Sequence, residues 1–164
     1  MNKLNFLGIG PKIAIVLLPW LTVSIFLSVK YKAVFTFCQP SCSSLYYTGV
    51  ALLVLGIIMY FSTVPLLLKG LKETRLVTTG AYYLCCNPLY AAIILFIIPG
   101  VALMINSWLI LTTTPAGYII FKLTIRKEYT EMISFFGDAY TKYRKETPEF
   151  FPFPFRKLFN RLKT

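Results

Sequence analysis

Two long stretches of this chain contain no charged residue, and they constrain its fold more than any other feature. The first runs from Ala33 to Leu68 and the second from Leu76 to Phe121. As one α-helix the second stretch would be about 69 Å long, twice the thickness of a bilayer core. It therefore predicts a hairpin of two membrane-spanning helices, with the turn at Asn106 and Ser107.

The apolar runs predict an all-α integral membrane protein with about four spanning helices in a single domain over residues 1–164. Only 14% of its residues are charged, against about a quarter in a water-soluble domain. The expected spans are residues 13–29, 45–68, 88–105 and 108–125. The first is not read as a signal peptide, because it contains the bulky Trp20 and lacks a small-residue cleavage site.

The distribution of basic residues predicts the orientation in the membrane. With the N-terminus in the cytoplasm, the outer loops hold only Lys30 and Lys32, and cytoplasmic segments typically carry the excess of lysine and arginine. The basic residues of the inner segments are Lys3, Lys12, Lys69, Lys72, Arg75, Arg126, Lys127, Lys142, Arg144, Lys145, Arg156, Lys157, Arg161 and Lys163. We expect both termini in the cytoplasm of a multi-pass protein, in the cell membrane of a prokaryote or the endoplasmic reticulum of a eukaryote. The basic excess thus indicates topology and not nucleic-acid binding.

Cytoplasmic helices are expected over residues 126–148, and an interfacial tail over 149–164. Phe136 and Gly137, followed by Asp138, predict a helix end and a new N-cap. In the tail, apolar residues recur with helical spacing opposite basic ones. The apolar positions are Phe155, Leu158, Phe159 and Leu162. This pattern is typical of an amphipathic helix that lies on anionic lipid, although a partner-binding helix would have the same pattern.

The chain has no histidine, which excludes histidine-ligated metals and a Ser-His-Asp triad. We expect no metal. Cys38 and Cys42 fall in the outer loop, where a disulfide and free thiols are both open readings. Cys85 and Cys86 fall at the inner mouth of the third span.

Two inner positions are candidates for chemistry. Asn87 and Pro88 open the third span, where Asn is a common cap and Pro fits the first helical turn. The alternative is that the preceding turn brings backbone amides to a helix start that suits a carboxylate. Glu128 lies close to hydrocarbon, where a carboxylate needs a partner or a function. An ordinary ion pair with Arg126 or Lys127 is the other reading.

These segments resemble a known family of membrane enzymes. Residues 76–90, LVTTGAYYLCCNPLY, resemble the T-x-G-P-Y-x-x-x-R-[HN]-P-x-Y element of the isoprenylcysteine carboxyl methyltransferase family. After a hydrophobic hairpin, FGDAYTKY at residues 136–143 and Pro148 resemble the family's E-E-x(7)-F-G-x-x-Y-x-x-Y pattern and its later proline. The resemblance covers about residues 65–155, and the first two spans match only in kind.

Members of this family transfer a methyl group from S-adenosylmethionine to a lipid-bearing substrate. The resemblance implies a cofactor site at the inner membrane face, between the start of the third span and the helix after the fourth. It implies a lipophilic substrate that enters from the bilayer. The implied cofactor contacts are Gly80, Tyr82, Asn87, Pro88, Tyr90, Glu128 and Tyr129. Of these, Tyr90 and Glu128 are the expected catalytic residues, whereas Tyr140 and Tyr143 are expected to pack the helix.

Three residues depart from the family's pattern. Cys86 stands in place of its arginine, Ala81 in place of a proline, and Tyr129 in place of the second glutamate. An arginine can bind a carboxylate through two parallel hydrogen bonds and a cysteine cannot, so Arg126 or Lys122 would have to replace it.

The expected reaction is O-methylation of a carboxylate, which is ionised at neutral pH and needs no general base. An amine or thiol substrate would need a base, and Glu128 or a tyrosine is the candidate for that role. The alternatives are a phospholipid amine N-methyltransferase and a catalytically degenerate membrane scaffold.

Overall fold

The computed structural model describes residues 10–38 and 42–152, and within them the regular elements are all helices. Three helices are long and apolar enough to cross a membrane: α1 (Gly10–Lys30), α3 (Ser43–Lys72), and α7 with α8 (Trp108–Phe136). These findings confirm the all-helical, membrane-type fold. The expected third span is a shorter apolar helix over Pro88–Met104, so the count of four spans stays a prediction.

The remaining elements are shorter. They are α2 (Lys32–Phe35), α4 (Ala81–Leu84), α5 (Pro88–Ala91), the π-helix η1 (Ala92–Ile97), α6 (Ile98–Met104) and α9 (Asp138–Glu146). The helices α7 (Trp108–Leu111) and α8 (Thr113–Phe136) follow one another along the same rod, and only Thr112 separates them. The amphipathic helix expected over residues 155–162 lies outside the described residues.

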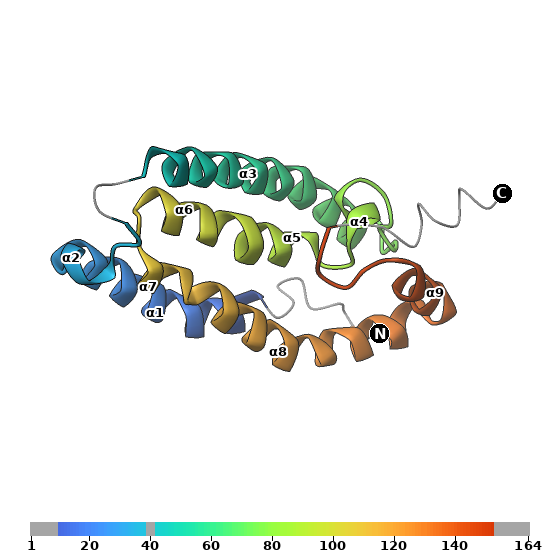
Figure 1. The fold of residues 1–164 in the computed structure, drawn as a ribbon. Coiled ribbons are helices and arrows are strands. Elements are labelled where there is room, and N and C mark those ends of the chain that lie inside the picture. Colours follow the sequence, from blue (N-terminus) through green and yellow to red (C-terminus); the bar gives the residue numbers. More distant parts are fainter. Residues whose placement is uncertain (1–9, 39–41, 153–164) are drawn as a thin grey trace.

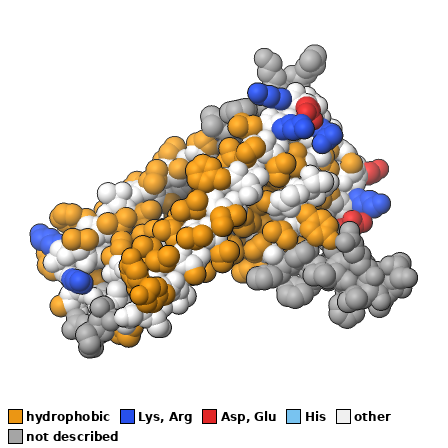
Figure 2. All heavy atoms as spheres, turned by 90° about the horizontal axis from the view of Figure 1, so that it is seen from above, with side chains coloured by type: hydrophobic (Ala, Val, Ile, Leu, Met, Phe, Trp, Pro, Cys, Tyr) orange, Lys and Arg blue, Asp and Glu red, His pale blue; other side chains and the backbone are white. Residues whose placement is uncertain are grey.

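The long elements form three layers (Figure 1). The continuous rod of α5, η1 and α6 lies in the middle, with α3 on one side and α1, α7 and α8 on the other. The short helices α4 and α9 lie together at one end of the molecule, which the sequence predicts to be cytoplasmic. Figure 2 shows apolar side chains over the middle of the molecule and charged side chains gathered toward its ends.

Small residues let α3 approach the middle layer closely. Gly49, Gly56, Thr63 and Gly70 recur every seven residues on α3 and are all buried. A Cβ atom added to Gly49 would lie 2.7 Å from the carbonyl oxygen of Gly100 on α6. Contacts through small residues are the usual way in which helices pack in membranes, where van der Waals contact replaces the hydrophobic effect.

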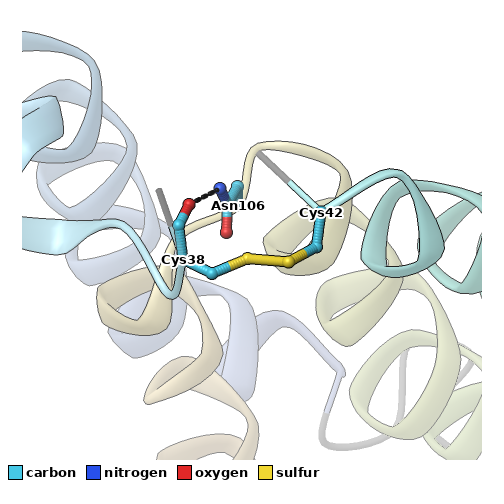
Figure 3. The surroundings of a disulfide bond; sticks show 3 residues. All are labelled: Cys38, Cys42 and Asn106. Carbon is cyan, nitrogen blue, oxygen red and sulfur yellow. Dashed lines mark hydrogen bonds between the residues drawn. A yellow bond between two sulfur atoms is a disulfide. The ribbon is translucent and has the colours of Figure 1, made fainter. Parts of the chain in front are cut away.

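The turn expected at Asn106 and Ser107 is confirmed. Asn106 has a φ of 59°, and the Ser107 side chain accepts a hydrogen bond from the backbone N–H of Ile110. The amide of Asn106 also donates to the carbonyl oxygen of Cys38 at 3.0 Å. Cys38 and Cys42 are paired as a disulfide beside this turn (Figure 3).

The helix break between α8 and α9 is also confirmed, but the predicted cap is wrong by one residue. Gly137 occupies the N-cap position of α9 with a φ of 57°, a backbone conformation that favours glycine. Asp138 is the first helical residue instead. Its carboxylate there has a favourable interaction with the positive end of the helix dipole.

The close contact between α3 and α6 gives a test of the fold. Gly49→Ala should lower the free energy of unfolding by about 1–3 kcal/mol, since the added methyl group meets backbone atoms that cannot rotate away. Reversible denaturation in detergent measures this difference. Gly10→Ala is the control, because its Cβ would have an ordinary contact of 3.9 Å with Tyr90. Equal stability of the two variants would contradict the backbone-to-backbone packing.

Candidate functional site

A pocket lies at the end of the molecule that holds α4 and α9. Its walls come from the C-terminal end of α3, the loop after it, α5, α8 and α9, together with Gly10 at the start of α1. Of the residues expected to contact a cofactor, five line this pocket: Tyr82, Asn87, Pro88, Tyr90 and Glu128. The pocket therefore unites residues of both motifs, which lie about forty positions apart in the sequence.

Gly80 and Tyr129 are described residues that lie outside the pocket lining. Gly80 begins α4 with a φ of 62°, and a Cβ atom there would lie 2.5 Å from the side chain of Leu66. Gly80 thus shapes the turn into α4, and its expected contact with a cofactor stays a prediction. Tyr129 is buried behind the pocket wall, where its hydroxyl group contacts Asn87.

The hydroxyl of Tyr90 on α5 donates to the Glu128 carboxylate on α8 at 3.4 Å. The Tyr90 ring also packs on Phe121 with a centroid distance of 5.5 Å. These contacts join the two helices that carry the two motifs. The two expected catalytic residues therefore lie beside one another in the pocket.

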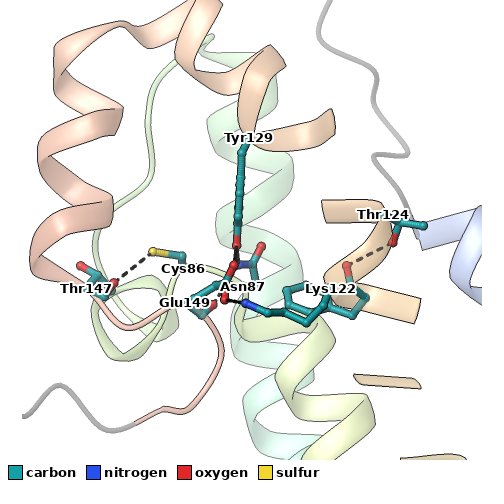
Figure 4. Close-up of polar contacts among 8 residues, drawn as sticks. Cys86, Asn87, Lys122, Thr124, Tyr129, Thr147 and Glu149 are labelled. Atoms are coloured by element: carbon teal, nitrogen blue, oxygen red, sulfur yellow. Dashed lines mark hydrogen bonds and ion pairs between the residues drawn. The ribbon is translucent and has the colours of Figure 1, made fainter. Parts of the chain in front are cut away.

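Pro88 occupies the first turn of α5, as predicted, but the capping role expected for Asn87 is wrong. Asn87 stands at the N-cap position of α5 and its side chain makes no capping hydrogen bond. Its Nδ2 instead donates to the hydroxyl of Tyr129 at 2.7 Å and to the backbone carbonyl of Glu149 at 2.9 Å (Figure 4). The amide is buried, so acceptors from other elements satisfy both of its N–H groups.

Glu149 was not foreseen as part of the site. Its Oε1 accepts a hydrogen bond from the Tyr129 hydroxyl at 3.0 Å, and its Oε2 pairs with Nζ of Lys122 (Figure 4). Lys122 therefore has a carboxylate partner away from the pocket. Its expected role as the replacement for the family's arginine has no support in this geometry.

Arg75 was also missed, and among the described residues it is the lysine or arginine that lines the pocket. It lies in the loop after α3, where its Nε is 4.0 Å from Glu73. Glu128 and Glu131 on α8 line the same pocket. The site thus combines one guanidinium with two carboxylates.

Cys86 is tied to the segment after α9. Its backbone N–H donates to the carbonyl oxygen of Pro148 at 2.8 Å, and its Sγ donates to that of Thr147 at 3.5 Å. Cys85 is fully buried, and burial raises the pKa of its thiol to about 12. At neutral pH Cys85 is therefore an unreactive thiol.

Three tyrosines that line the pocket have raised pKa values. Burial raises the pKa of Tyr82, and the Glu128 carboxylate raises it further. Burial also raises the pKa of Tyr140 and of Tyr143. The Tyr143 hydroxyl donates to the backbone carbonyl of Tyr82 at 2.6 Å, which fits its expected packing role, although both α9 tyrosines also line the pocket. At neutral pH these phenols can donate hydrogen bonds, but they do not act as bases.

Comparisons with known proteins are sparse. No protein-family model matches the chain, and no solved structure matches it. The chain is similar to the cobalt-zinc-cadmium resistance protein CzcN of Cupriavidus metallidurans, with 30% identity over 118 residues. The match covers 71% of this chain and 52% of CzcN, so the chain spans about half the length of this curated relative.

Proposed function

We propose that this chain is an S-adenosylmethionine-dependent methyltransferase that acts on a lipid-bearing substrate in the membrane. The observation that carries the proposal is the convergence of both motifs on one pocket. Tyr82, Asn87, Pro88 and Tyr90 come from the first motif, and Glu128 comes from the second. The resemblance to the methyltransferase family rests on these same residues.

The side chains of the pocket suit the chemical groups of the cofactor. S-adenosylmethionine has a sulfonium and an ammonium cation, one carboxylate and an aromatic base. Glu128 and Glu131 supply negative charge for the cations, and Arg75 supplies a fork of N–H donors for the carboxylate. The tyrosine rings supply faces that attract both cations and aromatic groups.

The proposed reaction needs little from the protein besides alignment and exclusion of water. The bound cofactor would supply an already activated methyl group. A carboxylate substrate is ionised at neutral pH, so its methylation needs no general base. This agrees with a pocket whose phenols outside the spans have raised pKa values. An amine substrate would leave Glu128 as the candidate base.

The topology belongs to the same proposal. We infer four spans, with α5, η1 and α6 as the third, and both termini in the cytoplasm. The distribution of lysine and arginine supports this orientation. It places the pocket at the cytoplasmic membrane face and the disulfide of Cys38 and Cys42 on the outer side.

The similarity to CzcN favours a second candidate function, a contribution to resistance against cobalt, zinc and cadmium ions. Within residues 10–38 and 42–152, no cluster of three or more Cys, Asp or Glu side chains is placed to hold a metal ion. Such a contribution would appear as a change in the tolerance of the cell to these ions. Growth of a deletion strain on media with and without each metal tests it, and unchanged metal tolerance would refute it.

Binding of the cofactor is the first prediction of the proposal. Calorimetry on the detergent-purified chain should show saturable binding of S-adenosylmethionine. Glu128→Gln and Asn87→Ala should each weaken it about tenfold, because each removes a polar contact worth about 1.5 kcal/mol. Lys127→Gln is the control, as an exposed neighbour of Glu128 outside the pocket lining. If folded wild-type protein binds neither S-adenosylmethionine nor S-adenosylhomocysteine, the scaffold reading is correct.

Arg75, which lies outside both motifs, gives a second prediction. Arg75→Gln should weaken cofactor binding about tenfold by removing the pocket's guanidinium, and Arg75→Lys should restore part of the loss. Lys72→Gln is the matched control, because it removes an exposed charge that does not line the pocket. Equal effects of Arg75→Gln and Lys72→Gln would mean that Arg75 acts only through long-range charge.

The dependence of the rate on pH separates the two substrate classes. Methyl transfer to a carboxylate should stay level from about pH 6 to pH 9, because the substrate is ionised and burial keeps Tyr82 protonated over that range. Transfer to an amine should rise with pH as the ammonium group loses its proton. Incorporation of radioactive methyl groups into membrane lipids measures both. A steep rise would replace the carboxylate with an amine substrate.

A further inference from the structure

We propose that Glu149 is a positioning residue, which acts through Tyr129 to fix the amide of Asn87 in the pocket wall. Glu149 lies on residues 147–152, which we call the C-terminal strap. The proposal rests on the methyltransferase function proposed above, since that function makes Asn87 a cofactor contact. It adds a residue that neither motif contains.

The hydrogen bonds of this cluster have only one consistent direction. The backbone carbonyl of Glu149 can only accept, so Nδ2 of Asn87 must face the strap. A carboxylate can likewise only accept, so the Tyr129 hydroxyl donates its proton to Oε1 of Glu149. The hydroxyl oxygen of Tyr129 is then the acceptor for the second N–H of Asn87. The backbone carbonyl of Glu149 thus orients the Asn87 amide, and its carboxylate orients the Tyr129 hydroxyl that holds the second N–H of that amide.

This orientation determines what Asn87 can offer to a ligand. An amide nitrogen has two hydrogens, and Tyr129 and Glu149 accept both of them. The capacity left to the side chain is its carbonyl Oδ1, which is an acceptor. An acceptor suits an ammonium group, a ribose hydroxyl or an amino group on a purine. Without the Glu149 carboxylate, the Tyr129 proton has no fixed acceptor on the strap, and the Tyr129 hydroxyl becomes a poorer acceptor for the second N–H of Asn87.

The strap is anchored independently of Glu149. The ring of Phe150 is only 2% exposed and lies 4.7 Å from Phe121 and 5.1 Å from Tyr118, measured between centroids. The next residue, Phe151, is 56% exposed. Phe121 also packs on Tyr90 of the pocket, so the anchor touches the pocket wall.

The strap also covers Cys86, whose backbone and thiol both donate to strap carbonyls. Cys86 also lines the pocket, so a rate of thiol alkylation above that of the wild type measures release of the strap. This measurement needs no cofactor, so it can be read even if the proposed function fails. The strap can be released by removing Phe150 without touching the Glu149 carboxylate.

The first arm of the test measures cofactor affinity on the full-length chain. Glu149→Ala should weaken S-adenosylmethionine binding about tenfold, as expected for a lost hydrogen bond to a charged group. Glu149→Gln keeps an acceptor for Tyr129 and loses only a part-exposed ion pair, so it should bind within about threefold of wild type. Glu146→Ala, an exposed glutamate at the end of α9, should have no effect. If Glu149 had a purely structural role, Glu149→Ala would lower the unfolding temperature, and Glu149→Gln would not restore cofactor affinity.

The second arm measures alkylation of Cys86 by N-ethylmaleimide without cofactor, read by mass spectrometry of the peptide. Phe150→Ala should speed alkylation about tenfold and also weaken cofactor binding, whereas Phe151→Ala should change neither. Wild-type affinity in Glu149→Ala, or equal weakening by alanine and glutamine, would overturn the positioning role. If wild type binds no cofactor while Phe150→Ala still exposes Cys86, the proposed function fails and the positioning role fails with it. Wild-type binding that ignores Glu149→Ala refutes the positioning role alone.

Discussion

Hydrocarbon excludes charge from the middle of this chain, and the place of the pocket follows from that constraint. An ionised side chain in a bilayer core is costly unless it is paired or functional. The chain meets this cost by leaving residues 76–121 without charge and by collecting carboxylates at one end. The spans then act as rods, and their ends bring the start of α5 beside the end of α8.

The helix α8 links the apolar layer to the site. It carries Phe121 within the core, then Lys122, and then Glu128 and Tyr129 near its polar end. Where the family's pattern has a second glutamate, Tyr129 reaches the carboxylate of Glu149 instead. Burial of Tyr129 and Asn87 demands partners for their polar groups, and the strap supplies them. Glu149, twenty positions downstream, thereby supplies the acceptor that the buried hydroxyl of Tyr129 requires.

Patterns with a local cause could be predicted from the sequence. The apolar runs located the long helices, and the polar pair at Asn106 located the hairpin turn because a turn interrupts an apolar run. The break at Gly137 followed from a glycine that adopts a positive φ. Of the residues named from the motif positions, five line the pocket, and Asn87 and Glu128 lie there together.

Features that depend on distant contacts could not be predicted in this way. The side chain of Asn87 could have capped α5 through its oxygen, but it makes no capping hydrogen bond, and its Nδ2 donates to α8 and the strap instead. Glu149 stands in a segment rich in phenylalanine and proline, which reads as the start of an interfacial tail. Arg75 belongs to a loop whose course no periodic pattern fixes. The four-span count and the positions of the termini stay predictions, because three helices meet the length of a membrane span.

The carboxylate of Glu149 has two partners: it forms an ion pair with Lys122 and accepts a hydrogen bond from Tyr129. A lysine on an apolar helix requires a negative partner, and Oε2 of Glu149 provides it for Lys122. A carboxylate is a pure hydrogen-bond acceptor. Oε1 can therefore receive the Tyr129 proton in one direction only. The Tyr129 hydroxyl that holds Asn87 thus shares its acceptor with Lys122, although Lys122 lies outside the pocket lining.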